Sequence, residues 1–277
     1  MLAELNRTGA FHRALLAVAT ATGRGWVDPA LVDPLEYMYR GNTAIAAMQY
    51  SYLPSWISFL VDQRRARQAG RELFNTIYDY WTTLPTNSRP RLVVLGESLG
   101  AYGAESAFSS VADLTTRTSG ALFTGPPNSS ALWRELTDAR THGSPEWQPI
   151  SGDGHTVRFA ASAADLHQPD GTLLHPKVVY LQHASDPIVW WSTKLAWQPP
   201  DWLTEPRGPD VNRQMHWYPL VTFWQVTCDM FAGNGAPPGH GHHYGPEVPT
   251  AWAAILNPPD WTSADTTRLT TREISGT

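Results

Sequence analysis

The sequence predicts an α/β fold in three layers, with helices on both faces of a mainly parallel sheet of about five or six strands. Three observations predict it. Short apolar runs recur along the chain, each is nearly continuous in apolar residues rather than alternating, and turns and helical patterns separate them. Continuous apolar runs mark strands that are covered on both faces. Strand–helix alternation then implies right-handed crossovers between parallel strands.

Five runs carry the strand prediction. They are ALLAVAT (14–20), TAIAAMQYSYL (43–53), RLVVL (91–95), GALFT (120–124) and KVVYLQH (177–183). Residues 126–176 are rich in Pro, Gly, Ser and Asp and contain only the short run TVRFA (156–160), so this stretch is expected to be irregular.

The clearest helical pattern extends from Ile57 to about Trp81. Its apolar residues recur every three or four positions and therefore share one stripe: Ala66, Ala69, Leu73, Ile77 and Trp81. The polar residues outside the stripe can face water: Arg64, Arg65, Arg67 and Gln68. A second helix is predicted over SLGAYGAESAFSS, directly after the third strand, and a third over Tyr218–Phe231.

The second half of the chain is interpreted as insertions on one domain, because α/β architectures of this size often remain single. Five prolines between 187 and 209 favour an irregular excursion over 187–215. The prediction is a single domain over 1–262, with a cap insertion at about 187–231 and a polar C-terminal tail over 263–277 that frays.

Tryptophan is over-represented, and six of the 13 copies fall within the cap: Trp190, Trp191, Trp197, Trp202, Trp217 and Trp224. Two interpretations stay open. The cap could use large aromatic residues simply to build a core. Alternatively it could form an apolar cover over a binding cleft, because tryptophan combines a large contact area with one polar group.

Composition argues against several classes of protein. The formal net charge of −5 leaves no basic footprint for nucleic acid. The single cysteine, Cys228, forbids an intrachain disulfide. No stretch approaches the ~18 apolar residues that a membrane span needs, and the N-terminus makes a poor signal peptide. A chain of this length can bury enough apolar surface to fold without a structural metal.

Residues 96–100 read GESLG directly after the run RLVVL. A bare G-x-S-x-G arises by chance in about one chain in ten of this length, so alone it is weak. The motif gains weight between a strand and a helix, because a nucleophilic serine there sits on a sharp, sterically crowded turn. Ser98 is therefore the candidate nucleophile, with the Leu99 N–H pointing at a developing oxyanion.

A serine hydroxyl needs a base that is oriented by a third group. Asp186 follows the strand KVVYLQH in ASDPIVWW; the alternative for Asp186 is a plain turn residue, because Asp-Pro commonly starts turns. The histidine comes from APPGHGHHYG, which contains His240, His242 and His243. Clustered histidines can also bind Zn²⁺, but no Cys pair or H-E-x-x-H motif supplies further ligands.

The order Ser, Asp, His along the chain is that of α/β-hydrolases, which strengthens the three weak signals together. A second oxyanion donor is expected from the loop after the first strand, ATATGRGWVDP. The N–H of Thr22 or of Gly23 is the candidate, and the alternative is an ordinary glycine turn.

The chain resembles a family of bacterial, largely actinobacterial, α/β-hydrolase domains. The resemblance covers most of the chain and rests on these segments: LNRTGAF, TATGRGWVDP, MQYSYLPSWISFLVD, LGESLGAYGAE, LQHASDPIVWW and PPGHGHHYG. It implies a nucleophile at Ser98, an acid at Asp186 and a base in the segment of His240 and His242. His242 is favoured, because in the motif it directly precedes the variable position that His243 fills.

Members of that family usually carry a membrane-spanning region ahead of this domain, and this chain has none. It is expected to be either a soluble member or an excised catalytic domain beginning near LAELNRTG, and its localisation stays open. The family resemblance adds a fold and a chemistry but no substrate.

The sequence thus predicts a serine hydrolase that cleaves carboxylic esters with apolar, aromatic or lipid-like groups, with no cofactor and no metal. Trp190 and Trp191 of the cap and Tyr52 of YSYLPSW are predicted to contact the substrate. A lipid transacylase using the same acyl-enzyme and a non-catalytic binding module are the alternatives. The expected partner is a small-molecule ester or a lipid, and the aromatic cap allows association with a membrane surface. The oligomeric state is not predicted.

Overall fold

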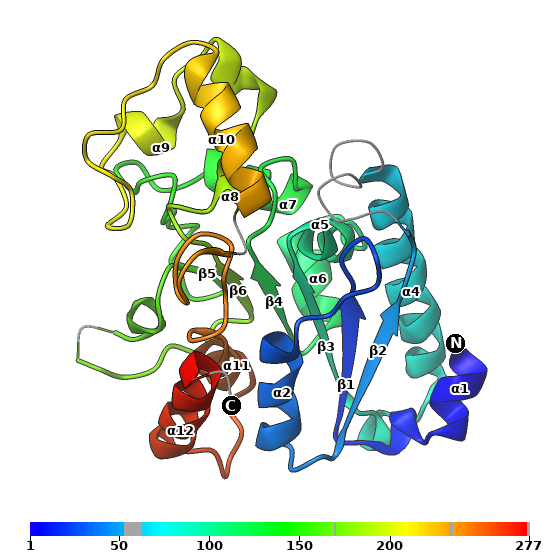
Figure 1. The fold of residues 1–277 in the computed structure, drawn as a ribbon. Helices are drawn as coiled ribbons and strands as arrows, with labels where there is room; N and C mark the ends of the chain where they lie inside the picture. The colour runs from blue at the N-terminus through cyan, green and yellow to red at the C-terminus, as the bar shows by residue number, and fades with distance from the viewer. Residues whose placement is uncertain (53–62, 169, 233–234, 276–277) are drawn as a thin grey trace.

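The computed structural model describes residues 1–52, 63–168, 170–232 and 235–275. Residue 53 of the second predicted strand and residues 57–62 of the first predicted helix lie outside this described part. Its centre is one six-stranded sheet in the order β2-β1-β3-β4-β6-β5, in which all neighbouring strands run parallel (Figure 1).

The predicted apolar runs form the strands. Their bounds are β1 Leu15–Thr20, β2 Thr43–Met48, β3 Arg91–Glu97, β4 Gly120–Thr124, β5 Val157–Ala160 and β6 Val178–Leu181. The parallel α/β sheet is therefore confirmed, and the short run TVRFA supplies the sixth strand. β2 ends five residues before the predicted limit.

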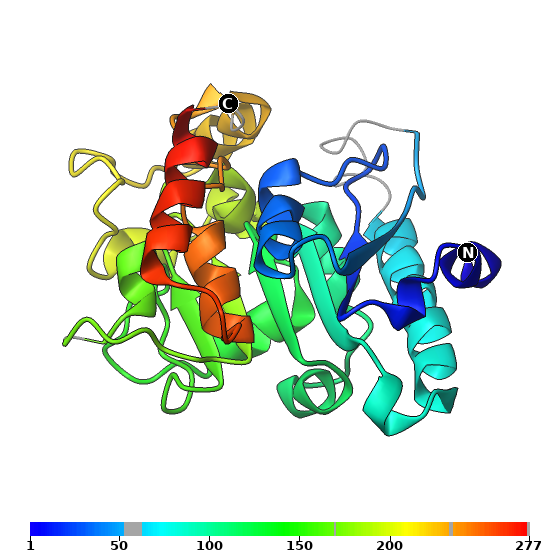
Figure 2. The ribbon, with the colours of Figure 1, turned by 90° about the horizontal axis from the view of Figure 1, so that it is seen from below.

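The strands are largely apolar because both faces of the sheet are covered; β1 and β4 are buried along their whole length. Leu16 and Val18 face a core built with α4 Gln63–Thr83, α5 Leu99–Glu105 and α7 Ala131–Asp138. Leu15 and Ala17 face the opposite core, built with α2 Pro29–Met38 and α11 Val248–Leu256. Figure 2 shows these two helical layers on either side of the sheet. The three-layer arrangement is as predicted.

The long helix α4 buries the stripe that its spacing predicts. Ala66, Ala69, Leu73 and Ile77 are buried, whereas Trp81 is partly buried and donates its Nε1–H to the carbonyl of Pro90 at 2.9 Å. The polar residues outside the stripe are exposed, as expected: Arg64, Arg65, Arg67 and Gln68.

The remaining helices are short and lie around this framework. Their bounds are α1 Leu2–Arg7, η1 Ala10–His12, η2 Thr86–Ser88, α6 Val111–Arg117 and η3 Ala163–Leu166. The helix predicted over 98–110 is thus shorter than expected and ends at Glu105. Ser110 then caps α6 by accepting the Asp113 N–H at 3.1 Å, so the intervening residues form a turn.

The cap, residues 187–231, lies beyond the end of the sheet towards which the strand arrows point (Figure 1). It contains α8 Pro187–Trp190, η4 Thr193–Ala196, α9 Asp201–Thr204 and α10 Val221–Ala232. α10 matches the helix predicted over Tyr218–Phe231. The core interpretation applies to Trp190 and Trp202, which are buried, whereas Trp197 and Trp224 are exposed. That the cap covers a binding cleft stays a prediction. That the whole chain is one domain with a cap stays a prediction.

The polar C-terminal segment is a helix, not the frayed tail that its composition predicts. α12 spans Ser263–Ser275 and packs on α11, burying Leu269 (Figure 2). Its start is capped reciprocally: Thr262 Oγ1 accepts the Asp265 N–H at 3.3 Å, and Asp265 Oδ2 accepts the Thr262 N–H at 3.0 Å. Such capping supplies orphan donors of the first turn with partners and favours a helix in a polar sequence.

Candidate active site

Ser98 occupies the single residue between β3 and α5. Its backbone has φ 54° and ψ −123°, a conformation that non-glycine residues rarely adopt. Its N–H donates to the carbonyl of Thr124 on β4 at 2.9 Å, which ties the turn to the end of the sheet. Strained backbone of this kind persists only where the surroundings hold it, and it is concentrated at functional sites. The turn has the strand–serine–helix form that the motif predicts.

The two glycines of GESLG allow the backbone to cross itself closely. A Cβ on Gly96 would lie 2.5 Å from the carbonyl of Gly100, and a Cβ on Gly100 would lie 2.2 Å from the carbonyl oxygen of Thr20 on β1. Contacts this short are not possible for real Cβ atoms. The glycines are therefore required by the approach of α5 to the strands, as expected.

Asp186 lies in the turn between β6 and α8, with no exposed surface. Its Oδ1 accepts the Ile188 N–H at 2.8 Å, which caps α8. Its Oδ2 accepts the Tyr244 hydroxyl at 2.7 Å and the His242 Nδ1–H at 2.7 Å. The turn-residue interpretation and the acid interpretation are thus compatible, because one carboxylate oxygen caps the helix and the other faces the imidazole.

Of the three clustered histidines, His242 is the one that reaches the acid. His243 donates its Nδ1–H to the carbonyl of Ala236 at 2.9 Å, and His240 is exposed. Burial disfavours the His242 imidazolium, but the Asp186 carboxylate outweighs this and raises the pKa of His242. Glu97 and Asp28 raise the same pKa further.

The His242 ring lies at the end of β4, beside the serine turn. A Cβ on Gly125 would lie 2.5 Å from Cε1 and 2.7 Å from Nδ1 of this ring. Gly125 directly follows Thr124, the residue that accepts the Ser98 N–H. No hydrogen bond joins the Ser98 hydroxyl to the imidazole in the described part of the chain. Catalytic hydrogen bonds are often long before substrate binds and tighten in the reacting complex.

The structure agrees with some of the predicted oxyanion donors and not with others. Leu99 is the first residue of α5, so its N–H belongs to the turn that has no intrahelical acceptor. The prediction for Thr22 is wrong, because its N–H is already donated to the carbonyl of Trp26 at 2.9 Å within the loop after β1. Gly23, buried in the same loop, stays a prediction.

The residues predicted to contact the substrate also differ in how far they are buried. Trp190 is only 2% exposed, packs against Trp133 and Trp202, and donates its Nε1–H to the carbonyl of His183 at 3.1 Å. It is a core residue without surface for a substrate, so that assignment is corrected. Trp191 is partly buried and Tyr52 is 77% exposed; their contact with substrate stays a prediction.

A further carboxyl group lies beside the candidate nucleophile. Glu97 is the last residue of β3, and burial raises its pKa to about 7. The His242 ring lowers this pKa, whereas Asp28 and Asp186 raise it. Sequence reasoning missed Glu97 because a variable position inside G-x-S-x-G carries no signal of its own.

Sequence reasoning also missed two residues that support the acid. Tyr244 donates its hydroxyl to Asp186, and the His183 ring stacks on Tyr244 with centroids 4.4 Å apart. Burial disfavours the His183 imidazolium, but Glu247, with its Oε1 3.5 Å from Nε2, outweighs this and raises the pKa of His183. Their proximity in sequence to His242 and Asp186 was the available signal.

A cavity of about 490 Å³ lies beside the acid and the histidine loop, lined by Ser185, Pro187, Asp210, Asp229, Gly235, Ala236, His240 and Gly241. Among the described residues, no three His, Cys, Asp or Glu side chains are arranged to hold a metal ion. Within the same part of the chain, no helix is both long and apolar enough to cross a bilayer.

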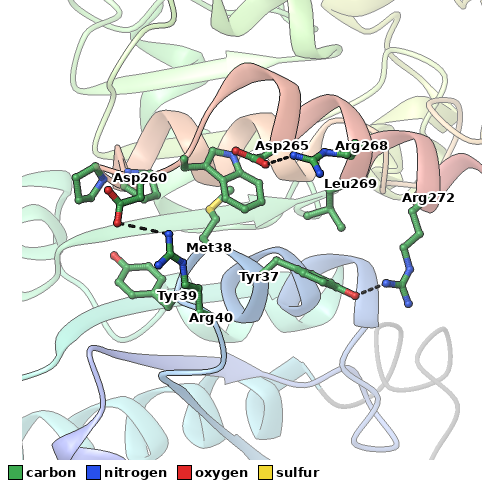
Figure 3. A pocket seen from close by; sticks show the side chains of 12 residues that line it. Tyr37, Met38, Tyr39, Arg40, Asp260, Asp265, Arg268, Leu269 and Arg272 are labelled. Carbon is green, nitrogen blue, oxygen red and sulfur yellow. Dashed lines mark hydrogen bonds and ion pairs between the residues drawn. The ribbon is translucent and has the colours of Figure 1, made fainter.

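A second cavity, of about 630 Å³, lies far from this chemistry, between α2 and α12 (Figure 3). Met38, Leu269 and Trp261 supply apolar lining. Its rim charges are paired, as Arg40 with Asp260 at 3.6 Å and Arg268 with Asp265 at 2.6 Å. No candidate catalytic residue lines it, so its volume is no reason to place the reaction there.

Comparison with known proteins gives one extensive match. A family model described as "Alpha/beta-hydrolase family" matches residues 1–269. The search of curated proteins returned no match. Among solved structures, an acetyl xylan esterase is 15% identical over 64% of this chain and 85% of that one, with a TM-score of 0.37. The catalytic core domain of the Trichoderma reesei acetyl xylan esterase is 16% identical over 64% and 86%, with a TM-score of 0.33. Likeness at this level says nothing of a shared substrate.

Proposed function

This chain belongs to the α/β-hydrolase family, and from that premise we propose that it is a serine hydrolase that cleaves carboxylic esters through an acyl-enzyme. One observation carries the proposal. The buried Asp186–His242 pair, 2.7 Å apart, lies at the same end of the sheet as the strained Ser98 turn. A nucleophile, a base and an orienting acid are the three parts that this chemistry needs.

Each residue has a defined step in the proposed mechanism. The Ser98 Oγ attacks the ester carbonyl carbon while His242 Nε2 takes its proton. Asp186 keeps the Nδ1–H tautomer and stabilises the imidazolium that forms. The N–H groups of Leu99 and Gly23 donate hydrogen bonds to the carbonyl oxygen and stabilise the negative charge that develops on it. The tetrahedral intermediate then expels the alcohol, which takes the proton from His242, and leaves the acyl group on Ser98. A water molecule, deprotonated by His242, attacks this acyl-enzyme in the same way. The second intermediate releases the carboxylic acid, and Ser98 takes the proton back from His242.

The most direct test compares the wild type with Ser98→Ala on a series of p-nitrophenyl esters of increasing acyl length. The wild type is expected to hydrolyse them, with a preference for apolar acyl groups, and Ser98→Ala to lose the activity. Ser109→Ala is the matched control, because Ser109 is an exposed serine a short distance along the chain. Full activity in Ser98→Ala would refute the mechanism, and no activity in the folded wild type would favour a non-catalytic binding module.

We also propose that the cap contacts a lipid surface. Its support is an aromatic face, defined as the exposed apolar residues of the cap: Trp197, Tyr218, Leu220, Val221, Trp224 and Phe231. Val221, Trp224 and Phe231 are spaced by three and seven residues on α10, so they share one side of the helix. Tryptophan and tyrosine are enriched where membrane meets water. A lipid-like ester would then reach Ser98 from the interface.

A vesicle sedimentation assay tests this contact. The double variant Trp197→Ala, Trp224→Ala is expected to lose most of its binding to phosphatidylcholine vesicles, while hydrolysis of a soluble short ester persists. Trp26→Ala is the control for vesicle binding, because Trp26 is 60% exposed but lies outside the cap. Equal binding by all three proteins would remove the lipid proposal and leave the ester chemistry intact.

Acyl transfer to an alcohol is the alternative reaction, and the aromatic face is the observation that favours it, because a lipid surface offers hydroxyl acceptors. Water and an alcohol compete for the same acyl-enzyme. Product analysis with a long-chain alcohol in the vesicle assay distinguishes the two: transfer that outpaces hydrolysis identifies a transacylase.

A further inference from the structure

Gly241, the residue that precedes the proposed catalytic histidine, is hydrogen-bonded through both its N–H and its carbonyl. Gly241 donates its N–H to the Ser185 Oγ at 2.9 Å. Its carbonyl accepts the His183 Nδ1–H at 2.8 Å. Both partners belong to the acid turn, defined as residues 183–186, which ends at Asp186. The segment that carries the base is therefore hydrogen-bonded to the segment that carries the acid, through the residue next to His242 and through Ser185, the residue next to Asp186.

The Ser185 hydroxyl can accept a hydrogen bond from the Gly241 N–H because its own proton is donated to a different group. Ser185 donates its hydroxyl to Asp210 Oδ2 at 2.5 Å, and its backbone N–H donates to the same oxygen at 3.0 Å. A serine hydroxyl has one proton and two lone pairs. With the proton directed at Asp210, a lone pair is available to Gly241. The carboxylate thus determines the orientation of the hydroxyl.

Asp210 comes from the cap, and the cap packs directly on the acid turn at this point. A Cβ on Gly208 would lie 2.1 Å from the Cβ of Ala184, so the two backbones are in close contact. Val211, on the other side of Asp210, is buried. The other oxygen of Asp210, Oδ1, is buried and has no hydrogen-bond partner among the described residues. Asp210 as a whole is partly buried, but a buried carboxylate oxygen without a partner is costly to retain, which points to a role for this residue.

We propose that Asp210 is a positioning residue for the catalytic histidine. Through Ser185 it fixes the N–H of Gly241, and so it keeps the adjoining His242 imidazole aligned between Asp186 and Ser98. The proposal rests on the proposed serine hydrolase mechanism and adds to it a carboxylate from the cap, which is linked through Ser185 to the proposed triad. Alignment matters because a misplacement of a catalytic group by about 1 Å can cost about 100-fold in rate.

The test uses four variants of the full chain on a soluble short ester. Asp210→Ala and Ser185→Ala are each expected to lower kcat roughly tenfold or more, with KM little changed, because each removes a charge-assisted contact to the acid turn. Asp210→Asn keeps an oxygen that can accept both Ser185 donors, and it is expected to retain most of the activity. Asp229→Ala is the matched control, because Asp229 lines the same cavity without a hydrogen bond to the acid turn.

The double variant Ser185→Ala, Asp210→Ala decides whether Asp210 acts through Ser185. If it does, the double variant is no slower than Ser185→Ala alone, because the contact can be lost only once. The acid limb of the kcat/KM pH profile provides a readout that mere destabilisation would not move. It is expected to shift to lower pH in Asp210→Ala but not in Asp229→Ala, because the misaligned imidazole loses part of its contact with Asp186. Glu97 and Asp28, which also face the ring, are unchanged throughout.

Three outcomes overturn the proposal while the wild type remains active. The first is equal kcat in Asp210→Ala and Asp229→Ala, and the second is a fall in kcat of the double variant equal to the product of the falls in its two single variants. The third is an equal fall in kcat in Asp210→Asn and Asp210→Ala, which would mean that only the charge of Asp210 matters. Asp210→Asn, which is nearly isosteric, keeps the test valid if an alanine variant fails to fold. An inactive wild type would instead refute the proposed function, so the two failures are distinguishable.

Discussion

At the scale of single residues, the site depends on one buried carboxylate. Asp186 is shared by three donors, from Ile188, Tyr244 and His242. The Asp186 carboxylate, through its charge and its hydrogen bond, raises the pKa of His242. His242 must be neutral to accept the Ser98 proton. Activity is therefore expected to rise with pH through the raised pKa of His242.

Asp186→Asn tests that dependence. The change is expected to lower kcat by roughly 10³- to 10⁴-fold, because the amide no longer selects the Nδ1–H tautomer. It is also expected to move the acid limb of kcat/KM to lower pH, since the carboxylate that raises the histidine pKa is gone. Tyr244→Phe removes a single donor to the same oxygen and is expected to be far milder. Equal pH profiles for Asp186→Asn and the wild type would contradict the account.

The sequence predicts the residues whose roles show in chain order, and it fails where roles depend on burial. Ser98, Asp186 and His242 are predicted from a motif and its order; the structure brings Asp186 and His242 together, and their catalytic roles stay a prediction. Trp190 and Thr22 were assigned wrongly, because neither the packing of an indole nor the acceptor of a loop N–H can be read from composition. Asp210 lies 24 residues from the acid and 32 from the base in the numbering, so only the fold brings it to them.

At the scale of elements, the chemistry sits where strands end. β3, β4 and β6 each lead into a turn that carries part of the site: Ser98, Gly125 and the acid turn. Parallel strands end at one edge of the sheet, so residues far apart in sequence meet there. The strands were predictable because both sheet faces are buried, which leaves continuous apolar runs. The end of α5 and the presence of α12 were less predictable, because short capping contacts decide where a helix begins and ends.

Gly125→Ala tests the contact between the end of β4 and the histidine ring. Gly125 has φ +51°, and an added Cβ would lie 2.5 Å from His242 Cε1. The ring must move, so kcat is expected to fall by roughly 100-fold. Gly143→Ala is the matched control, because Gly143 has φ +91° with no atom within 4 Å of its Cβ position. The control carries the backbone strain without the collision. Equal kcat in both variants would show that His242 is not acting at this place.

At the scale of the whole molecule, buried carboxyl groups make stability depend on pH. Glu105 is 2% exposed, and burial raises its pKa to about 8, although the N–H groups of Trp133 and Leu132 lower it. Burial likewise raises the pKa of Glu146 to about 7. Between the ordinary glutamate pKa and these raised values, the folded state binds more protons than the unfolded state. Stability therefore falls as pH rises, by at most about 1.4 kcal/mol per pH unit for each group.

Glu105→Gln is expected to flatten this dependence. The free energy of unfolding of the wild type, measured in urea, should decrease between pH 5 and pH 8. The variant should lose less stability over the same interval, because the glutamine does not ionise. Glu135→Gln, an exposed position on α7, is the control and should keep the wild-type slope. A wild-type stability that rises over this interval would contradict the burial argument.

The overall architecture was the most predictable level, because many residues contribute to the same pattern. The parallel sheet and the two covering layers follow from apolar runs and helical spacing. What the pattern does not carry is a substrate, since the same fold hosts many reactions. The proposed ester class depends on the cap, whose aromatic face is a property of the folded molecule.

The central claim is that Ser98 is an acyl-accepting nucleophile, and the most direct measurement is covalent. The protein is reacted with a fluorophosphonate, digested with trypsin and analysed by fragmentation of the peptide spanning residues 92–117, which also contains Ser106, Ser109 and Ser110. One adduct on Ser98 is predicted, together with no labelling of Ser98→Ala. An adduct on another residue, or equal labelling of the folded Ser98→Ala variant, would contradict the account.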